Sequence, residues 1–332
     1  MHIRQITEER ELKLLSPHAT KACLSQGRVW PESECSIRTA FQRDRDRILH
    51  SKAFRRLKHK TQVFIRPEGD HYRTRLTHTL EVSQIARTIA RSLALNEDLT
   101  EAISLGHDLG HTPFGHAGEQ ALNRLLSKGF RHNEQSLRVV DKLEGENGLN
   151  LTLETRDGIF CHTGDSLPST PEGCIVRLAD RIAYINHDID DALRAGILQK
   201  EQLPRDTLAI LGETHSERIH NMVSDIITHS QGRGIIQASQ EIEDAMDELR
   251  DFLFEHVYIG SAAKKDEGKA EKIIEILFTH YMEHPDQLPA SYQVIWQQEG
   301  LESAVADYVA GMTDRFIIHL FEQMFIPQAW TP

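Results

Sequence analysis

The chain has 332 residues, with 38 Lys and Arg against 50 Asp and Glu, and 39% of its residues are apolar. This composition is typical of a globular protein with one large core or two smaller ones, and it excludes fibrous repeats and long disordered tracts. The sequence has no run of about 18 apolar residues that could cross a membrane, and its N-terminus lacks the pattern of a secretory signal. We therefore expect a cytoplasmic protein with no membrane partner.

The four cysteines form no CxxC pair, so the sequence indicates neither a disulfide framework nor a thiolate zinc site. We expect buried free thiols at these positions, which are Cys23, Cys35, Cys161 and Cys174. Histidine is the outlier of the composition, with 19 residues, and the positions of these histidines decide the functional interpretation.

Apolar residues recur at helical spacing through most of the chain. The clearest stripes cover residues 82–93, 175–189, 242–253, 270–281 and 301–312. Alternating patterns are scarce, and only Thr61–Ile65 and Leu149–Leu153 resemble short extended pieces. The sequence therefore predicts an all-α fold with at most a minor short-strand element.

The domain organisation follows from the shortness of the loops. Residues 163–173 and 261–268 are loop-like, but neither stretch resembles a linker between independent domains. We expect an N-terminal extension over 1–35, a helical core over 36–200, and a C-terminal helical region over 201–332 packed on that core.

Positive charge is concentrated between Arg38 and Arg75, where twelve basic residues face four acidic ones. This segment carries a net charge of +8 and leaves −20 elsewhere, which indicates a polyanionic partner such as a nucleotide or a nucleic acid. For residues 44–47, a helix face of Asp/Arg pairs is an equally good interpretation. For 55–60 and 73–75, which lie closer to the histidines below, we favour anion binding.

His78 comes first among the candidate metal ligands, at the start of the helix whose apolar stripe begins at Val82. The segment from Gly106 to Glu119 holds the highest density of candidate ligands, since its fourteen residues include three histidines, two carboxylates and four glycines. His107 and Asp108 are adjacent at the end of an apolar helix. Both can reach one ion there, because the helix geometry relaxes where the helix ends.

Three polar residues interrupt the apolar helix predicted over 175–189. Asp180, Tyr184 and Asp188 recur at i, i+4 and i+8 and therefore project from one face. An ionised aspartate in so apolar a helix needs a partner. A salt bridge to Arg177 or Arg181 would supply one, but the His-Asp pair upstream favours a shared metal ion.

These residues resemble the H…HD…D signature of the HD-domain phosphohydrolases. The sequence around these residues resembles the deoxyguanosinetriphosphate triphosphohydrolase family over about residues 36–320. The segments that carry this resemblance are 46–57, 60–63, 73–78, 107–119, 132–135 and 310–315. The resemblance implies an HD-domain helical bundle with additional C-terminal helices. It also implies a divalent cation, Mn²⁺, Mg²⁺, Fe²⁺ or Ni²⁺, bound by His78, His107, Asp108 and Asp180.

The implied activity is hydrolysis of dGTP or other deoxynucleoside triphosphates to deoxynucleoside and tripolyphosphate. His116 and Glu119, three residues apart, resemble the catalytic pair of the family, with Glu119 orienting the imidazole, and we place His111 beside the phosphates or a metal-bound water. The residues that we expect to bind the substrate are Gln62 at the 3′ hydroxyl, Arg75, His132 and Asn133 at the phosphates, and Tyr184 and Asp188 at the sugar. Weaker candidates, for which a surface charge or a subunit contact is the alternative, are Lys60, Lys264, Lys265 and Arg315.

Other questions stay open at this stage. The chain resembles a compact branch of the family, whose members need not prefer guanine. Some relatives form tetramers or hexamers, and some bind single-stranded DNA, so we expect a homo-oligomer and keep DNA as a candidate partner. The alternative functions are another HD-type nucleotide phosphohydrolase and a nucleic-acid-binding protein with a structural HD site.

Overall fold

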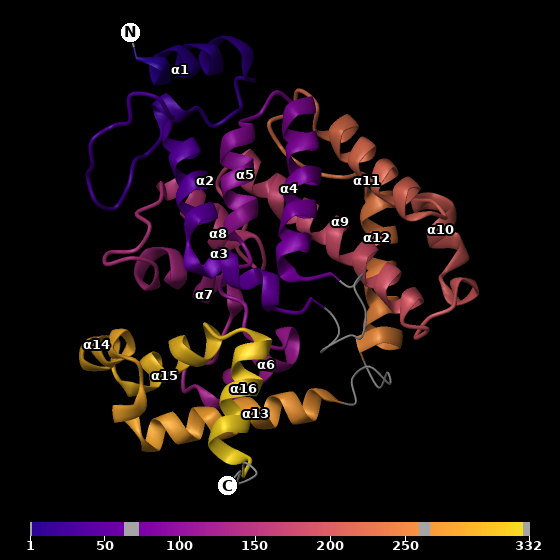
Figure 1. The fold of residues 1–332 in the computed structure, drawn as a ribbon. Coiled ribbons are helices and arrows are strands. Elements are labelled where there is room, and N and C mark those ends of the chain that lie inside the picture. Colours follow the sequence, from indigo (N-terminus) through magenta and orange to yellow (C-terminus); the bar gives the residue numbers. More distant parts are fainter. Residues whose placement is uncertain (1, 63–72, 259–265, 328–332) are drawn as a thin grey trace, which may run out of the picture.

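The computed structural model of the protein describes residues 2–62, 73–258 and 266–327. Within these residues it forms sixteen α-helices and no strand, which confirms the predicted all-α fold (Figure 1). In chain order the α-helices are α1 (Ile3–Leu14), α2 (Ala40–His50), α3 (Lys52–Arg56), α4 (Arg75–Ser92), α5 (Glu97–Gly106), α6 (Gly115–Leu125), α7 (His132–Arg138), α8 (Leu153–Cys161), α9 (Pro171–Arg194), α10 (Arg205–Leu211), α11 (His215–Ser230), α12 (Gln240–Leu253), α13 (Glu267–Glu283), α14 (Ala290–Glu299), α15 (Leu301–Ala310) and α16 (Asp314–Phe325). Short 3₁₀ and π turns lie between them: η1 (Ala22–Leu24), η2 (Leu57–His59), η3 (Val139–Leu143), η4 (Lys200–Gln202), η5 (Phe254–Tyr258) and η7 (Pro285–Gln287).

In the described residues, β-type backbone pairing is limited to two isolated β-bridges. Arg28 pairs with Thr152, and Thr61 pairs with Thr74. Each segment that we expected to be extended thus contributes one bridge residue. Leu153, which we placed in the second extended piece, instead begins α8, and residues 63–65 of the first lie outside the described residues.

The main core lies between α4, α5 and α9. α4 and α9 pack along each other, and α5 packs against both. Their apolar stripes meet in one cluster, in which Val82, Leu99 and Ile175 are fully buried. Burial of each such side chain stabilises the folded state by about 1.5–3 kcal/mol. α10, α11 and α12 add further residues to this cluster, and α11 and α12 cover α9 (Figure 1).

A second core surrounds α6. Leu122 of α6 belongs to the same buried cluster as Ile274 of α13 and Val305 of α15. Figure 1 shows α6 among α13, α15 and α16, away from α10. The C-terminal region over 201–332, which we expected to pack on the core, contributes to two cores, with α10–α12 in the first and α13–α16 in the second.

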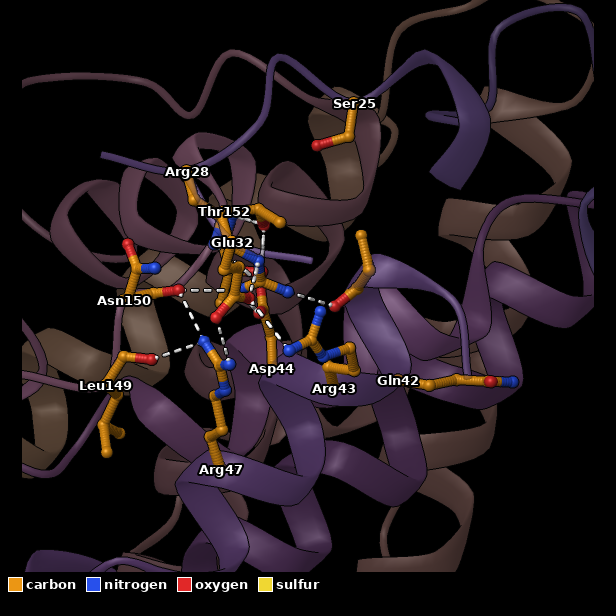
Figure 2. Close-up of polar contacts among 12 residues, drawn as sticks. Ser25, Arg28, Glu32, Gln42, Arg43, Asp44, Arg47, Leu149, Asn150 and Thr152 are labelled. Atoms are coloured by element: carbon orange, nitrogen blue, oxygen red, sulfur yellow. Dashed lines mark hydrogen bonds and ion pairs between the residues drawn. The ribbon is translucent and has the colours of Figure 1, made fainter. Parts of the chain in front are cut away.

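Most of the arginines of α2 take part in internal ion pairs. The Glu32 carboxylate is paired with Arg28 at 2.8 Å, Arg43 at 3.1 Å and Arg47 at 2.7 Å. Arg28 also pairs with the fully buried Asp44 (Figure 2). Within residues 44–47, only Arg45 and Asp46 form the kind of exposed Asp/Arg pair that we considered an equal alternative. Asp44 is buried, and Arg47 pairs with Glu32 from the loop before α2.

Further details of the sequence interpretation need correction. Cys161 is buried as expected, but Cys23 is exposed, and Cys35 and Cys174 are half-buried. The loop predicted over 163–173 ends earlier, because Pro171 begins α9, a position where its missing N–H costs nothing. Among the described helices, none is both long and apolar enough to span a bilayer.

Candidate metal centre and active site

The helices of the main core bring the four predicted metal ligands together. His78 lies in the first turn of α4, which begins where the Thr74 side chain accepts a hydrogen bond from a backbone N–H. His107 directly follows α5, and Asp108 comes next, where the helix has ended. Asp180 lies in the middle of α9, which packs on both α4 and α5.

The ligand atoms converge on a small volume. His78 Nε2 lies 3.0 Å from Asp180 Oδ1, and His107 Nε2 lies 3.7 Å from the same oxygen. Asp108 Oδ1 is 3.5 Å from His107 Nε2, and its Oδ2 is 3.9 Å from His78 Nε2. One ligand atom each of His78, His107 and Asp108 lies within 4.8 Å of the others, a spread that one cation can bridge.

The chemistry of these donors fits a divalent cation. His107 Nδ1 donates to the Ser104 carbonyl at 2.7 Å, so Nε2 is the ring nitrogen that can offer a lone pair to a cation. That Nε2 atom is buried and has no hydrogen-bond partner among the described residues. Two imidazole nitrogens and two carboxylates form a mixed N/O set that suits a first-row divalent ion and leaves positions open for other ligands.

Both aspartates are ionised in spite of their burial. Burial by itself raises the pKa of Asp108, but the neighbouring imidazoles and the Arg75 guanidinium, 3.0 Å from Oδ2, hold that pKa well below its usual value. Burial also raises the pKa of Asp180, but the hydrogen bond with His78 and the neighbouring imidazoles of His107 and His162 together outweigh burial and lower that pKa. The centre therefore holds two buried negative charges that a cation would compensate.

A second layer of side chains fixes the orientation of His78. His78 Nδ1 lies 3.4 Å from His187 Nδ1, His187 Nε2 lies 2.7 Å from Glu81, and Glu81 is paired with Arg73 at 3.3 Å. Because a carboxylate only accepts, we assign the His187 proton to Nε2, so that its Nδ1 accepts the Nδ1–H of His78. This arrangement leaves His78 Nε2 directed at the metal centre, as outer partners of metal-binding histidines commonly do.

The predicted catalytic residue Glu119 contacts His132, whose ring stacks on His111 beside this centre. We expected Glu119 to orient His116, and that role stays a prediction. The Glu119 carboxylate accepts the ring Nδ1–H of His132 at 3.1 Å and the backbone N–H of the same residue at 2.9 Å. The reason is that α7 begins at His132, and the unpaired N–H groups of a helix start attract a carboxylate. His116 itself is exposed near the start of α6.

His111 lies next to Asp108, and its expected contact with the phosphates or a metal-bound water stays a prediction. Its Nε2 is 3.0 Å from Asp108 Oδ1, and its ring stacks on that of His132 with centroids 3.9 Å apart. Burial, followed by the charges of Arg75 and His132, lowers the pKa of His111 well below the usual value. His111 is therefore a neutral imidazole at pH 7.

The structure describes three of the predicted sugar-binding side chains, Tyr184, Asp188 and Gln62. Tyr184 and Asp188 share one face of α9 with Asp180, and burial raises the pKa of Tyr184 to about 12, so its hydroxyl stays protonated at neutral pH. Gln62 Oε1 is buried without a hydrogen-bond partner in the described part of the chain. Asn133, by contrast, donates its amide to a backbone carbonyl in the last turn of α8 at 2.8 Å, so phosphate binding by Asn133 stays a prediction.

The turn before α6 is held by residues that are far apart in the chain. Phe114 and Gly115 both adopt left-handed backbone conformations, with φ of 62° and 56°, which costs about 1 kcal/mol or more for a phenylalanine. Asp314 accepts the backbone N–H groups of Phe114 and Thr61, each at 3.0 Å. Lys60, for which a surface charge was the alternative, is instead buried and donates to the carbonyls of His111 and Ala310. Arg315 is exposed, and Lys264 and Lys265 lie outside the described residues.

Two histidines of this region were missed in the sequence analysis. His162 directly follows α8 as His107 follows α5, and its Nδ1 donates to the Ile159 carbonyl at 2.7 Å. Burial lowers the pKa of His162 to about 3. The sequence could have indicated His162, because a histidine directly after an apolar helix is the same pattern that indicated His107. The position of His187, one residue before Asp188, gave no such indication.

We predict that His187→Gln weakens Mn²⁺ binding by about tenfold to a hundredfold, because the outer partner of His78 no longer fixes its tautomer. Isothermal titration of the metal-free protein with Mn²⁺ measures the change. His220→Gln, at an exposed position of α11, serves as the control and keeps the wild-type affinity. An unchanged affinity in His187→Gln would show that His78 is oriented without this contact.

We also predict that Glu119 contributes to stability against acid. Burial opposes its ionisation, but the hydrogen bonds with His132 lower its pKa from 4.5 to about 2. Since the folded-state pKa is lowered, the stabilisation is complete above pH 4.5 and is lost as the pH falls toward 2. Its size is at most about 3 kcal/mol. In urea unfolding of metal-free protein, Glu119→Gln should therefore lose less stability over this pH range than wild type, whereas Glu201→Gln, on the surface, should follow wild type.

Comparisons with known proteins agree with this geometry. Residues 75–185 match the HD domain, and residues 236–323 match the phosphohydrolase-associated domain. The chain is 60% identical to a deoxyguanosinetriphosphate triphosphohydrolase-like protein of Caldanaerobacter subterraneus subsp. tengcongensis, over 99% of this chain and 98% of that protein. It is 48% identical to a protein of the same description from Clostridium tetani, over 99% and 97%.

A solved structure of a hypothetical protein from Aquifex aeolicus aligns with a TM-score of 0.47 and 18% identity, covering 85% of this chain and 71% of that one. The full-length relatives are the stronger finding, because their similarity includes every residue range that supplies the centre described above. The chain belongs to the deoxyguanosinetriphosphate triphosphohydrolase-like family of HD-domain proteins.

Proposed function

We propose that the protein hydrolyses deoxynucleoside triphosphates, with a divalent cation, to a deoxynucleoside and tripolyphosphate. The observation that carries the proposal is the convergence of His78, His107, Asp108 and Asp180, with Tyr184 and Asp188 on the next turns of α9. The names of the full-length relatives support the same reaction. They leave the preferred base open.

The chain's own residues supply the contacts that the reaction needs. When bound, a divalent cation polarises a phosphoryl oxygen and compensates developing charge. Arg75 is held beside this position by its ion pair with Asp108, and its Nε has no hydrogen-bond partner in the described residues, so it can bind a phosphate oxygen. We assign the transfer of a proton to the leaving 5′ oxygen to His116, which is exposed in the first turn of α6.

The sugar would lie along α9. With the phosphates at the metal centre, the Tyr184 ring is one helical turn from Asp180 and Asp188 is two turns away. A ring packed beneath C2′ leaves no room for a ribose hydroxyl. The open acceptor of Gln62 is suited to a hydroxyl donor such as the 3′ group.

Nucleic-acid binding as the sole function has less support. Four of the arginines that suggested a polyanionic partner take part in internal ion pairs, Arg43 and Arg47 with Glu32, Arg45 with Asp98, and Arg38 with Asp46. Such pairs cancel the local field that a phosphate backbone would need. A homo-oligomer stays a prediction from the sequence.

The central test identifies the phosphate product. Protein, Mn²⁺ and each of the four deoxynucleoside triphosphates are incubated, and the products are separated by ion chromatography. We expect tripolyphosphate in a 1:1 ratio with the deoxynucleoside, and a loss of at least about a hundredfold in His107→Ala, because a ligand of the cation is removed. Release of pyrophosphate or orthophosphate instead would point to a different HD-type phosphohydrolase.

A second prediction concerns sugar selectivity. Tyr184→Ala should reduce the preference for dGTP over GTP by about tenfold or more, since contact with a ring is what excludes the 2′ hydroxyl. Tyr184→Phe keeps the ring and should keep most of the preference. The ratio of kcat/KM for the two substrates is the readout, and equal ratios in wild type and Tyr184→Ala would assign selectivity to another residue.

A further inference from the structure

The first turn of α6 lies directly against the residues expected to bind the sugar and the phosphates. A methyl group placed at Gly115 would lie 3.3 Å from Arg75 Nη2 and 3.4 Å from the backbone carbonyl oxygen of Gln62. His116 is the next residue of the same turn. The segments that carry the proposed contacts to the 3′ hydroxyl, the phosphates and the leaving oxygen therefore meet at one glycine.

Two of these segments are tied to each other by backbone pairing. Thr61 and Thr74 form an antiparallel bridge, and the Arg75 backbone N–H donates to the Lys60 carbonyl at 3.0 Å. These contacts join the residue before Gln62 to the residue before Arg75. Neither contact reaches the turn that begins α6, so another group has to hold that turn beside them.

One buried carboxylate joins the α6 turn to this pair of segments. Asp314, the first residue of α16, accepts the backbone N–H of Phe114 with Oδ1 at 3.0 Å. Its Oδ2 accepts the backbone N–H of Thr61 at 3.0 Å and the Thr61 hydroxyl at 2.7 Å. Asp314 is only 4% exposed, so water competes little for these three bonds. The two oxygens of one rigid group thus fix how far Gln62 lies from the turn that carries His116.

The α6 turn needs this support because its backbone is strained. Phe114 has a φ of 62°, a left-handed conformation that is rare for a residue with a large side chain. Such a conformation persists only where its surroundings hold it firmly. Here the Phe114 ring packs in the second core, and its N–H is held by Asp314. Loss of that acceptor would release the turn two residues before His116.

We propose that Asp314 is a positioning residue of the active site, which holds Gln62 and His116 at a fixed separation through the backbones of Thr61 and Phe114. The inference rests on the proposed function, because that function assigns Gln62 to the 3′ hydroxyl and His116 to the leaving oxygen. It goes further by placing a determinant of sugar recognition on α16, far along the chain from both residues. A fixed separation matters because a small misplacement of one contact lowers the rate.

The test compares Asp314→Asn with wild type in the full-length protein with Mn²⁺. The substitution keeps the shape of the side chain but turns one acceptor oxygen into an NH₂ donor, so either Phe114 or Thr61 loses its acceptor. We expect kcat/KM for dGTP to fall at least about tenfold. The Mn²⁺ affinity should stay at the wild-type value, because the bonds of Asp314 go to Phe114 and Thr61. Glu322→Gln, exposed on the same helix, is the matched control and should behave as wild type.

The preference for dGTP over 2′,3′-dideoxy-GTP separates positioning from a general loss of structure. The dideoxy nucleotide lacks the 3′ hydroxyl, so the preference measures the Gln62 contact. Asp314→Asn should lower this preference at least about fivefold, and the double variant with Gln62→Ala should lower it no further than Gln62→Ala alone. If Asp314→Asn does not fold, Thr61→Val removes only the hydroxyl bond and should lower the preference about threefold.

Equal losses on the two nucleotides would overturn the proposal and leave Asp314 with a structural role alone. Additive losses in the double variant would also overturn it, by separating Asp314 from Gln62, and so would a wild-type protein without any preference. Equilibrium binding of both nucleotides with Ca²⁺ gives a preference that does not depend on turnover. If Asp314→Asn loses this binding preference while wild type releases no tripolyphosphate, the positioning role stands and the proposed reaction is refuted.

Discussion

The centre depends on keeping Asp108 and Asp180 ionised inside a packed helical core. A buried carboxylate without compensation would be neutral, and it would then be a poor metal ligand. Here Arg75 and the neighbouring imidazoles lower the pKa of Asp108, and the neighbouring imidazoles lower the pKa of Asp180. The His107 ring is in turn fixed from behind by a backbone carbonyl and the His78 ring by His187, so the directions of these two lone pairs are set before any ligand arrives.

The elements that carry the ligands could be predicted from the sequence because local rules determine them. Helical spacing defined α4, α5 and α9, and the i, i+4, i+8 spacing placed Asp180, Tyr184 and Asp188 on one face. The position of His107 after an apolar stretch located the end of α5. What the sequence could not supply was the meeting of these helices, which came from the family resemblance and is consistent with their packing in the structure.

Contacts that the sequence did not indicate involve partners chosen by tertiary packing. The Glu119 carboxylate binds His132, which is 13 residues away in the chain, because the start of α7 lies against α6. The basic segment looked like an anion-binding surface, but Glu32 lies outside that segment and pairs with three of the nearby arginines (Figure 2). A net charge counted along a sequence window is therefore no measure of surface potential when the partners lie in another window.

Lys60 and Asp314 make the HD helices dependent on the C-terminal ones. Lys60 bridges the carbonyls of His111 and Ala310, and Asp314 satisfies the N–H of a strained Phe114. An excised HD segment ending near residue 200 would bury a lysine without its acceptor from α15 and would release the turn that begins α6. The two matched domains are thus joined at the turn that begins α6, and a chain in which only one of them was exchanged would have to recreate both contacts.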